Sequence, residues 1–395
     1  MVSTLPTLEE AARTSAAAAP FLPPVLQPLF DASSVRSHML CGEFVSRLTI
    51  GVMREARLHA APRQWVSAAD LVAKAGLEPE RSLVPVDWML RHLATRGVFV
   101  RDDGRFMAPD GLPALEAGEV RATQTMHDPG CMPSYAVAET AAQDYPAFLR
   151  GERSGEDILF TPARLKLWTG YFSNDNGLYA VNNRTGAVAL EAWMRPGPAT
   201  ILELGGGLGS GTAAVLERLK EAGRLDDVRA YRFTELVPAF LRRARPVAER
   251  FPGVPLTFAT LDMNRPFGDQ GVAAGSVSVV YAVNTLHAAH DFAFTLGEVR
   301  RALVPGGQLI IAECVRPMPS RTVYPEFIFN LMQTFRAPRL HAAYRPNGGF
   351  LTPEQWTAAL TAAGFTDVRV LPDIARIRDV IPDFGVAAIG ATSAA

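Results

Sequence analysis

Residues 201–212 read Ile-Leu-Glu-Leu-Gly-Gly-Gly-Leu-Gly-Ser-Gly-Thr, which is the most informative stretch of the sequence. An apolar run typical of a buried strand leads into a glycine-rich turn, and a helical segment follows. Glycine lets a backbone approach a ligand closely, and the amides at a helix start favour bound polar groups. The stretch therefore predicts a ligand site at the glycine loop, which contains Gly205, Gly207 and Gly209.

Working outward from this loop, strand-like apolar runs alternate with helical segments across residues 196–395. This alternation predicts an α/β fold with a doubly wound, mostly parallel sheet of Rossmann type and helices on both faces. The end of the chain is expected to add an antiparallel pair at residues 367–371 and 385–393. The other predicted strands are 200–204, 230–233, 256–260, 277–283 and 308–312, and the main predicted helices are 211–222, 238–251, 292–303 and 352–363.

Residues 31–150 form a second region, which is mainly helical. Apolar residues recur at helical spacing over 35–59, 66–76 and 82–96, where Pro85 suits the first turn of the last helix. A hairpin with the turn Asp103-Gly104 follows. The order helix, helix, hairpin predicts a winged helix-turn-helix. Residues 1–30, rich in Ala and Pro, are expected to be a flexible arm, and residues 151–195 to be a helical connector that lines the site.

Charge argues against binding of nucleic acid. The 395 residues carry a net charge of −1, and residues 62–107 hold seven Lys or Arg against six Asp or Glu. Neutralising phosphates requires a clear surplus of basic side chains. The chain also has no apolar run long enough to span a membrane, no secretory signal and only three widely spaced cysteines, so we expect a cytoplasmic enzyme.

Three acidic residues around the glycine loop indicate the kind of ligand. Glu203 directly precedes the glycines and would attract a cationic group but repel phosphates. Glu235 ends the next strand, where a carboxylate accepts hydrogen bonds from both ribose hydroxyls. Asp262 ends the third strand and is expected to accept from the adenine amino group, with Met263 packed on the ring; the alternative is a cap of the next turn. S-adenosylmethionine, a nucleoside with a cationic amino-acid end, fits this pattern.

The ordered set of motifs resembles class I S-adenosylmethionine-dependent methyltransferases, and in particular the C-methyltransferase domains of polyketide synthases. The resemblance adds Leu236 and Asn284 to the expected cofactor site. The helical first half instead resembles the winged-helix dimerisation domain of small-molecule O-methyltransferases, which implies a homodimer through that domain. The stretches that carry the first resemblance are 202–209, 231–241, 284–288, 304–307 and 363–365.

Two further strand ends carry the expected chemistry. His287 follows the fourth strand and Glu313 ends the fifth. These strands are neighbours in the resembling families, which have a His–Glu pair at the matching positions. We therefore expect His287 to act as a general base that Glu313 orients. His290 and Asp291 follow closely, but their spacing matches no metal motif, so no metal is expected.

The acceptor site is predicted from two aromatic stretches, for which core packing is an equal alternative. The first stretch precedes the glycine loop, and the second follows the fifth strand with an arginine near its end that would hold an acidic group. The expected substrate-binding residues are Trp168, Asn176, Tyr179, Phe329, Met332 and Arg345.

The expected reaction is methylation of a small natural-product acceptor. The helical first half favours O-methylation of an acidic hydroxyl or carboxyl group. The polyketide-synthase-like second half favours the alternative, C-methylation of an activated carbon. A third hypothesis is a winged-helix regulator that senses S-adenosylmethionine.

Overall fold

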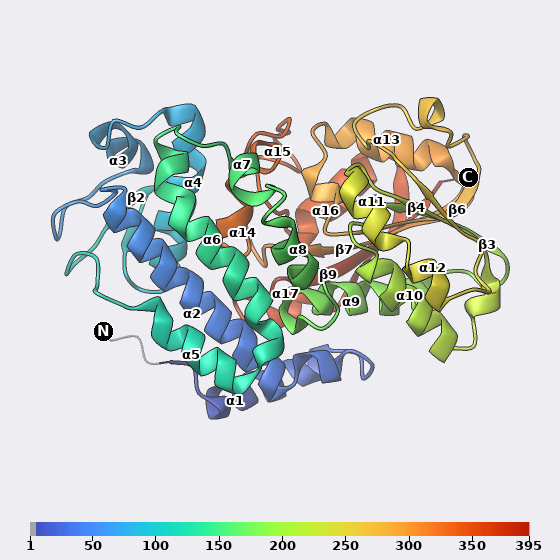
Figure 1. Ribbon diagram of the computed structural model, residues 1–395, viewed down its shortest axis with the longest axis horizontal. Helices are drawn as coiled ribbons and strands as arrows, with labels where there is room; N and C mark the ends of the chain where they lie inside the picture. The colour runs from blue at the N-terminus through green and yellow to red at the C-terminus, as the bar shows by residue number, and fades with distance from the viewer. Residues whose placement is uncertain (1–4, 395) are drawn as a thin grey trace.

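The computed structural model describes residues 5–394, which form a helical part and a seven-stranded sheet (Figure 1). The strand order is β5-β4-β3-β6-β7-β9-β8. Strands β3 to β7 pair in parallel, whereas β9 runs antiparallel between β7 and β8. The mostly parallel sheet and its closing antiparallel pair are thus confirmed. The strands are β3 Ala199–Leu204, β4 Val228–Thr234, β5 Leu256–Ala259, β6 Val277–Val283, β7 Leu303–Cys314, β8 Phe365–Leu371 and β9 Val386–Ser393.

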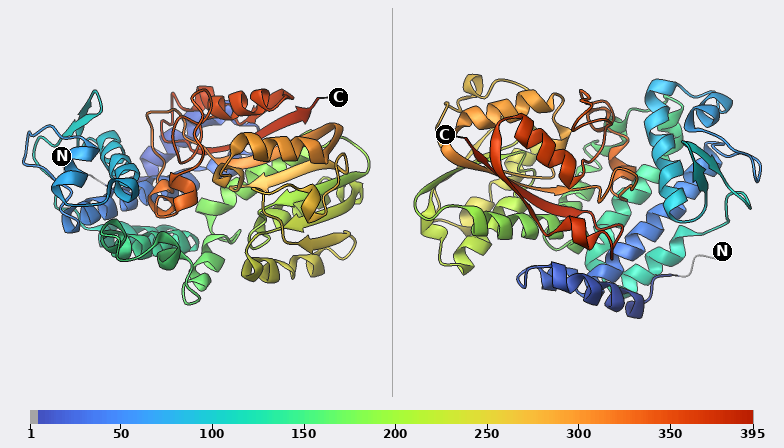
Figure 2. Two further views of the ribbon diagram at one scale, coloured as in Figure 1. Left: turned by 90° about the horizontal axis from the view of Figure 1, so that it is seen from above. Right: turned by 180° about the vertical axis from the view of Figure 1, so that it is seen from behind.

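Helices cover both faces of this sheet, as its apolar runs require (Figure 2). Ile201 packs on one face with α9, α10 and α12, and Leu202 packs on the other with α13 and α16. The helix expected over 238–251 is split into α11 and α12 around Pro246, which lacks the amide that would continue the helix. These helices are α9 Gly177–Trp193, α10 Ser210–Glu221, α11 Pro238–Ala244, α12 Val247–Arg250, α13 Phe292–Ala302 and α16 Pro353–Ala362. Shorter elements are η4 Leu225–Asp227, η5 Gly268–Gln270, η6 Leu286–Ala288, α14 Glu326–Phe329, α15 Gln333–Arg336 and α17 Ile374–Ile377.

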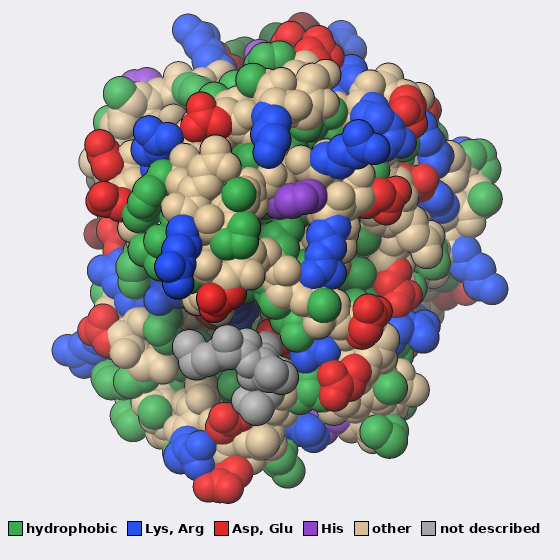
Figure 3. Space-filling model, turned by 90° about the vertical axis from the view of Figure 1, so that its left-hand side faces the viewer, with side chains coloured by type: hydrophobic (Ala, Val, Ile, Leu, Met, Phe, Trp, Pro, Cys, Tyr) green, Lys and Arg blue, Asp and Glu red, His purple; other side chains and the backbone are tan. Residues whose placement is uncertain are grey.

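Within the helical part, α3 and α4 are followed by the β1–β2 hairpin, in the predicted order. Figure 3 presents its outer face, on which basic and acidic side chains are interspersed. Among residues 5–394, no helix is both long and apolar enough to cross a membrane. The elements are α2 Ala32–Glu55, α3 Ala68–Lys74, α4 Pro79–Thr95, β1 Val100–Asp102, β2 Arg105–Met107, α5 Ala117–His127, η3 Pro129–Cys131 and α6 Met132–Leu149, followed by α7 Gly155–Leu159 and α8 Leu165–Tyr171 in the connector.

The flexible arm expected over residues 1–30 is not what the structure contains. Residues 1–4 lie outside the described part of the chain, but α1 Leu8–Ala18 is a helix with a complete capping box at Thr7. Ala11, Ala18 and Phe30 are buried. The Ala-rich composition hides this order, because small apolar residues at helical spacing pack closely without a strong hydrophobic pattern. η1 Ala19–Phe21 and η2 Gln27–Phe30 continue the segment.

Pro85 differs from its expected place, because α4 begins at Pro79 and Pro85 lies inside the helix. A proline at this position leaves the carbonyl of Arg81 without its helical donor. Arg336 Nη1 donates to that carbonyl at 3.0 Å instead. A second contact from α4 lies nearby: Trp88 Nε1 donates to Glu326 Oε2 at 2.8 Å, and the buried Glu326 also pairs with Arg316. Buried polar groups of the helical part are therefore satisfied by the segment after β7.

Candidate active site

The glycine loop follows β3 in a conformation that other residues rarely adopt. Gly205, Gly207 and Gly209 have φ of +58°, +58° and +83°. A Cβ on Gly205 would lie 2.3 Å from Thr285 Cγ2, so the close approach of these two segments requires glycine. A Cβ on Gly207 would meet nothing within 4 Å. The loop thus leaves an open cradle in front of Gly207, while Gly209 forms the turn into α10.

A cavity of about 610 Å³ opens in front of this loop. At its edge, Glu235 Oε2 accepts from the amide of Gly207 at 2.9 Å and Oε1 accepts from the amide of Val237 at 2.8 Å. Burial raises the pKa of Glu235, and these backbone donors lower it in part. Each carboxylate oxygen keeps a lone pair for a further donor, which is what a ribose diol would supply.

Glu203 lies deeper in the same cavity and is 1% exposed. Its Oε2 accepts from Thr212 Oγ1 and, at 2.9 Å, from the hydroxyl of Tyr231. Burial raises the pKa of Glu203 to about 7, although both hydroxyls lower it. A cation bound beside Glu203 would return the carboxyl to its charged form.

The remaining predicted cofactor residues also border this cavity. Leu236, Asp262 and Met263 line it from the ends of β4 and β5. Asp262 Oδ1 accepts from the amide of Asn264 at 2.9 Å, so Asp262 also makes the turn that was the alternative to adenine binding. Asn284 lines the cavity with a left-handed φ of +46°, which asparagine tolerates, and its Oδ1 accepts from the amide of Cys314 at 2.6 Å.

His287 and Glu313 lie side by side at the ends of β6 and β7. His287 Nδ1 is 2.6 Å from Glu313 Oε2, and Glu313 Oε1 accepts from the amides of Thr285 and His287 at 3.2 and 3.3 Å. Since a carboxylate only accepts, Nδ1 carries the proton and Nε2 is the nitrogen that can act as a base. The pair therefore has the geometry of a base held in one tautomer by a carboxylate.

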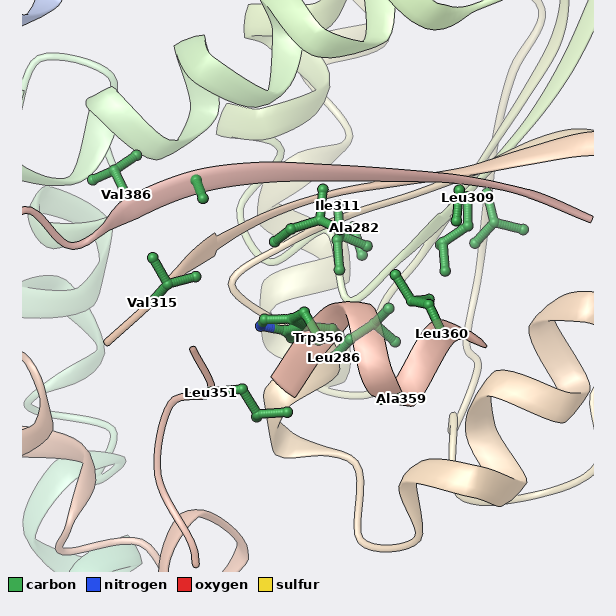
Figure 4. Packing of buried hydrophobic residues seen from close by; sticks show 14 of the residues in the cluster. Ala282, Leu286, Leu309, Ile311, Val315, Leu351, Trp356, Ala359, Leu360 and Val386 are labelled. Atoms are coloured by element: carbon green, nitrogen blue, oxygen red, sulfur yellow. The ribbon is translucent and has the colours of Figure 1, made fainter. Parts of the chain in front are cut away.

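Hydrogen bonds and ring packing fix the position of the segment that carries His287. Arg345 donates to the carbonyls of His287 and Ala289 at 2.5 and 2.9 Å. The ring of Phe350 packs edge-on against His287, with centroids 4.7 Å apart. Leu286 is fully buried beside Trp356 of α16 (Figure 4). These contacts leave the imidazole little freedom to turn.

A second cavity, of about 500 Å³, meets the first at His287. Tyr179, Asn284 and Phe329 also line both cavities. The second cavity is mostly apolar, and its polar groups include His38, whose Nδ1 lies 3.2 Å from the hydroxyl of Tyr324. Burial lowers the pKa of His38 to about 4, so its imidazole is neutral at pH 7. This cavity suits an apolar molecule whose reacting end lies beside His287.

Known proteins resemble this chain in sequence and in fold. Residues 202–309 match the family described as "Methyltransferase domain". The chain is 29% identical over 353 residues, 87% of its length, to the polyketide synthase ThaG of Burkholderia thailandensis and 32% identical over 177 residues, 45% of its length, to the reducing polyketide synthase Preu2 of Preussia isomera. It spans only 6% and 7% of these relatives. The solved structure of the CurJ carbon methyltransferase has a TM-score of 0.76 over 98% of this chain and 99% of its own, at 22% identity, which establishes the fold.

Residues 202–309 are a methyltransferase domain, and the chain has the fold of class I S-adenosylmethionine-dependent methyltransferases. The cofactor fits the residues present, because the open cradle at Gly207 admits a nucleoside, Glu235 retains acceptor capacity and Glu203 offers a buried carboxyl for a cation. No group of three or more metal-ligating side chains is found in residues 5–394.

Every predicted cofactor residue except Gly209 lines the cofactor cavity. Gly209 instead forms the turn that leads into α10. Of the predicted substrate residues, Tyr179 and Phe329 line both cavities, whereas Trp168 and Met332 line the cofactor cavity alone. Trp168 also belongs to a buried aromatic cluster, and its Nε1 donates to the carbonyl of Leu159 at 2.6 Å.

Two predicted substrate residues, Asn176 and Arg345, line neither cavity. Asn176 is buried away from both cavities and donates to the carbonyl of Tyr171 and to Ser134 Oγ, each at 2.8 Å. Arg345 is 1% exposed and lines neither cavity. Its guanidinium donates to carbonyls of the His287 loop.

The sequence did not indicate that residues of the helical part line the second cavity. His38 and Met39 come from α2, and Arg96 from the end of α4. Gly42 is the one available signal: a Cβ there would lie 2.7 Å from Arg96 Nη2, so this glycine within a helix makes room for the guanidinium. Phe350 follows a glycine pair and has no pattern that would have indicated contact with His287.

Proposed function

We propose that this methyltransferase transfers a methyl group to an activated carbon of a polyketide-type acyl acceptor. The observation that carries the proposal is the His287–Glu313 pair, 2.6 Å apart, at the point where the cofactor cavity meets the apolar cavity. The polyketide synthases among the relatives favour C-methylation over the O-methylation that the helical part suggested.

The chemistry follows from the placement of the base. When bound, S-adenosylmethionine supplies a methyl group on a sulfonium and leaves as S-adenosylhomocysteine. A carbon between two carbonyl groups is acidic, so a neutral imidazole suffices to remove its proton. His287 Nε2 takes that proton, and Glu313 stabilises the resulting imidazolium. The new carbon–carbon bond then replaces the broken carbon–hydrogen bond, and the proton leaves His287 to solvent.

The shape of the second cavity supports an acyl acceptor. Aromatic and aliphatic side chains such as Phe350, Val386 and Met39 line it. Arg96 also lines it, with Nη2 at 3.4 Å from Asp383 Oδ2. An acyl chain would be desolvated along these apolar walls while its dicarbonyl end reaches His287. Holding the chain in this way aligns the reacting carbon with the donor, which is the main requirement of an in-line displacement.

The test is the position of the transferred methyl group. The protein is incubated with a β-ketoacyl thioester of N-acetylcysteamine and a donor whose methyl group carries carbon-13. Mass spectrometry detects the transfer, and carbon-13 NMR distinguishes a methyl group on carbon from one on oxygen. The His287→Ala variant, in which the base is removed but the cofactor cavity keeps its charges, is the matched control.

A carbon-bound methyl group that requires His287 supports the proposal. A methyl ether or ester contradicts it and indicates O-methylation. No transfer to any β-ketoacyl thioester, in protein that binds S-adenosylhomocysteine, contradicts the assigned acceptor class while leaving the cofactor site intact.

A further inference from the structure

Asn183 lies on α9 in the wall of the cofactor cavity, outside every motif that indicated the cofactor. Its side chain is fully buried, with 0% exposure. Its Nδ2 donates to Asn174 Oδ1 at 2.7 Å, but its Oδ1 has no hydrogen-bond partner within residues 5–394. A buried acceptor without a donor is energetically costly, so it calls for an explanation.

The neighbours of Asn183 determine which way its amide points. Ser210 offers a backbone carbonyl, which only accepts, so Asn174 presents Nδ2 to it, at 2.9 Å. Asn174 Oδ1 is therefore the acceptor for the next amide, and Asn183 turns Nδ2 toward it. The remaining atom of Asn183, its Oδ1, is the one left without a donor among the described residues.

The unpartnered oxygen faces the same space as the buried carboxyl of Glu203. The position that a Cβ on Gly211 would take lies 3.3 Å from Glu203 Oε1 and 3.6 Å from Asn183 Oδ1. Glu203 uses its other oxygen, Oε2, for Thr212 and Tyr231. One amide oxygen and one carboxyl oxygen thus converge without a donor between them, which is the surrounding that an ammonium group with three N–H donors satisfies.

We propose that Asn183 Oδ1 binds the α-ammonium group of the cofactor, together with Glu203 Oε1. Asn183 is then a cofactor-binding residue contributed by the connector. The inference rests on the cofactor alone and is independent of whether carbon or oxygen is methylated.

This role gives α9 a function in both cavities. Asn182, the preceding residue, lines the acceptor cavity, with its Oδ1 3.9 Å from Cys314 Sγ, and Tyr179 lines both cavities one turn earlier. A cofactor bound to Asn183 would therefore also fix the position of α9, which lines the second cavity.

The experiment compares two ligands, one with and one without the amino-acid end that carries the proposed contact. S-adenosylhomocysteine carries the ammonium group, whereas 5′-methylthioadenosine has the same nucleoside thioether without the amino-acid end. Calorimetry measures both affinities for the wild type, Asn183→Ala and the matched control Asn182→Ala, which removes an equally buried amide from the same helix.

We expect Asn183→Ala to lower the affinity for S-adenosylhomocysteine by about 10- to 100-fold, the scale of a hydrogen bond to a charged group. The affinity for 5′-methylthioadenosine should stay within about twofold of the wild type. Asn182→Ala should leave both affinities unchanged. An equal loss for both ligands would show a structural role and overturn the proposal, as would an unchanged affinity for S-adenosylhomocysteine.

A second variant keeps the test decisive if Asn183→Ala does not fold. Asn174→Ala removes the partner that orients the Asn183 amide and leaves the cavity wall in place. We expect it to lower the affinity for S-adenosylhomocysteine, but not for 5′-methylthioadenosine, by about two- to fivefold. Without Asn174, the Asn183 amide can also turn so that Nδ2 takes the place of Oδ1. Loss of selectivity between the two ligands would overturn the proposal here too.

Discussion

The two cavities that meet at His287 are built from different materials. The cofactor cavity uses backbone and carboxylates: the open turn at Gly207, Glu203 and Glu235 all come from the ends of adjacent parallel strands. The second cavity, proposed to hold the acceptor, is lined by apolar side chains from α2 and α9 and from segments that follow β7. The cofactor, whose structure and charge do not vary, is thus expected to bind to fixed polar groups at the ends of the strands. The proposed acceptor, which is more apolar, is expected to bind through its fit to the apolar cavity. Substitutions in one cavity should therefore leave binding in the other unchanged, except at residues that border both.

The largest expected effect comes from His287, which lies where the two cavities meet. His287→Ala should lower turnover by about 10²- to 10⁴-fold, the usual loss when a general base is removed. The affinity for S-adenosylhomocysteine should remain within about twofold, because the cofactor's expected partners are untouched. Steady-state kinetics and calorimetry on the same preparation measure both quantities. A variant with wild-type turnover would show that alignment alone drives the reaction.

Glu235 tests the cofactor side by itself. Glu235→Ala should weaken S-adenosylhomocysteine by about 10- to 100-fold, since two charged acceptors for the ribose hydroxyls are lost. Turnover at saturating cofactor should change much less. Calorimetric titration decides the first point. The ribose assignment is incorrect if the affinity is unchanged.

Protonation of Glu203 should make cofactor binding dependent on pH. The pKa of Glu203 is about 7 in the free protein, raised by burial and by the nearby Glu235 and lowered by hydrogen bonds from Thr212 and Tyr231. Below this pH the carboxyl is neutral and attracts an ammonium group weakly. The affinity for S-adenosylhomocysteine should fall about tenfold from about pH 8 to about pH 6. A flat profile for the wild type, or the same slope in Glu203→Gln, would contradict the role of this carboxyl.

The smallest effect is expected on the acceptor side. Met39→Ala removes a half-buried side chain from the wall contributed by α2. We expect the KM for a β-ketoacyl thioester to rise about three- to tenfold because apolar contact is lost, with unchanged affinity for S-adenosylhomocysteine. A change in cofactor affinity of similar size would show that the two cavities are not independent.

Much of the sheet could be predicted because its signals are local. The run 277–283 coincides with β6, and the glycine loop with its following helix lies where the pattern indicated. Strand ends of a parallel sheet meet at one edge, so the order of the strands along the chain sufficed to assign Glu203, Glu235 and Asp262 to one cavity. The expectation that His287 lies beside Glu313 came instead from the resemblance to known methyltransferases.

The acceptor side could not be predicted in the same way. Its walls join α1, α2 and the loop around Phe384, whose proximity depends on packing between distant segments. Arg345 follows an aromatic stretch, but its place beneath the His287 loop depends on carbonyls that no spacing reveals. Asn183 likewise lacks a motif, and only its unpartnered oxygen indicates a role. Dimerisation through the helical part stays a prediction that light scattering would test.

The hydrogen bond from Trp88 to Glu326 limits how this chain can be divided. A fragment beginning near residue 196 would keep the buried Glu326 but lose the indole that satisfies it, and the carbonyl freed by Pro85 would lose Arg336 in the complementary fragment. Chimeras made to change acceptor choice should therefore exchange α4 and residues 316–350 together. The helical part and the segment after β7 therefore depend on each other structurally, although more than two hundred residues of chain separate Trp88 from Glu326.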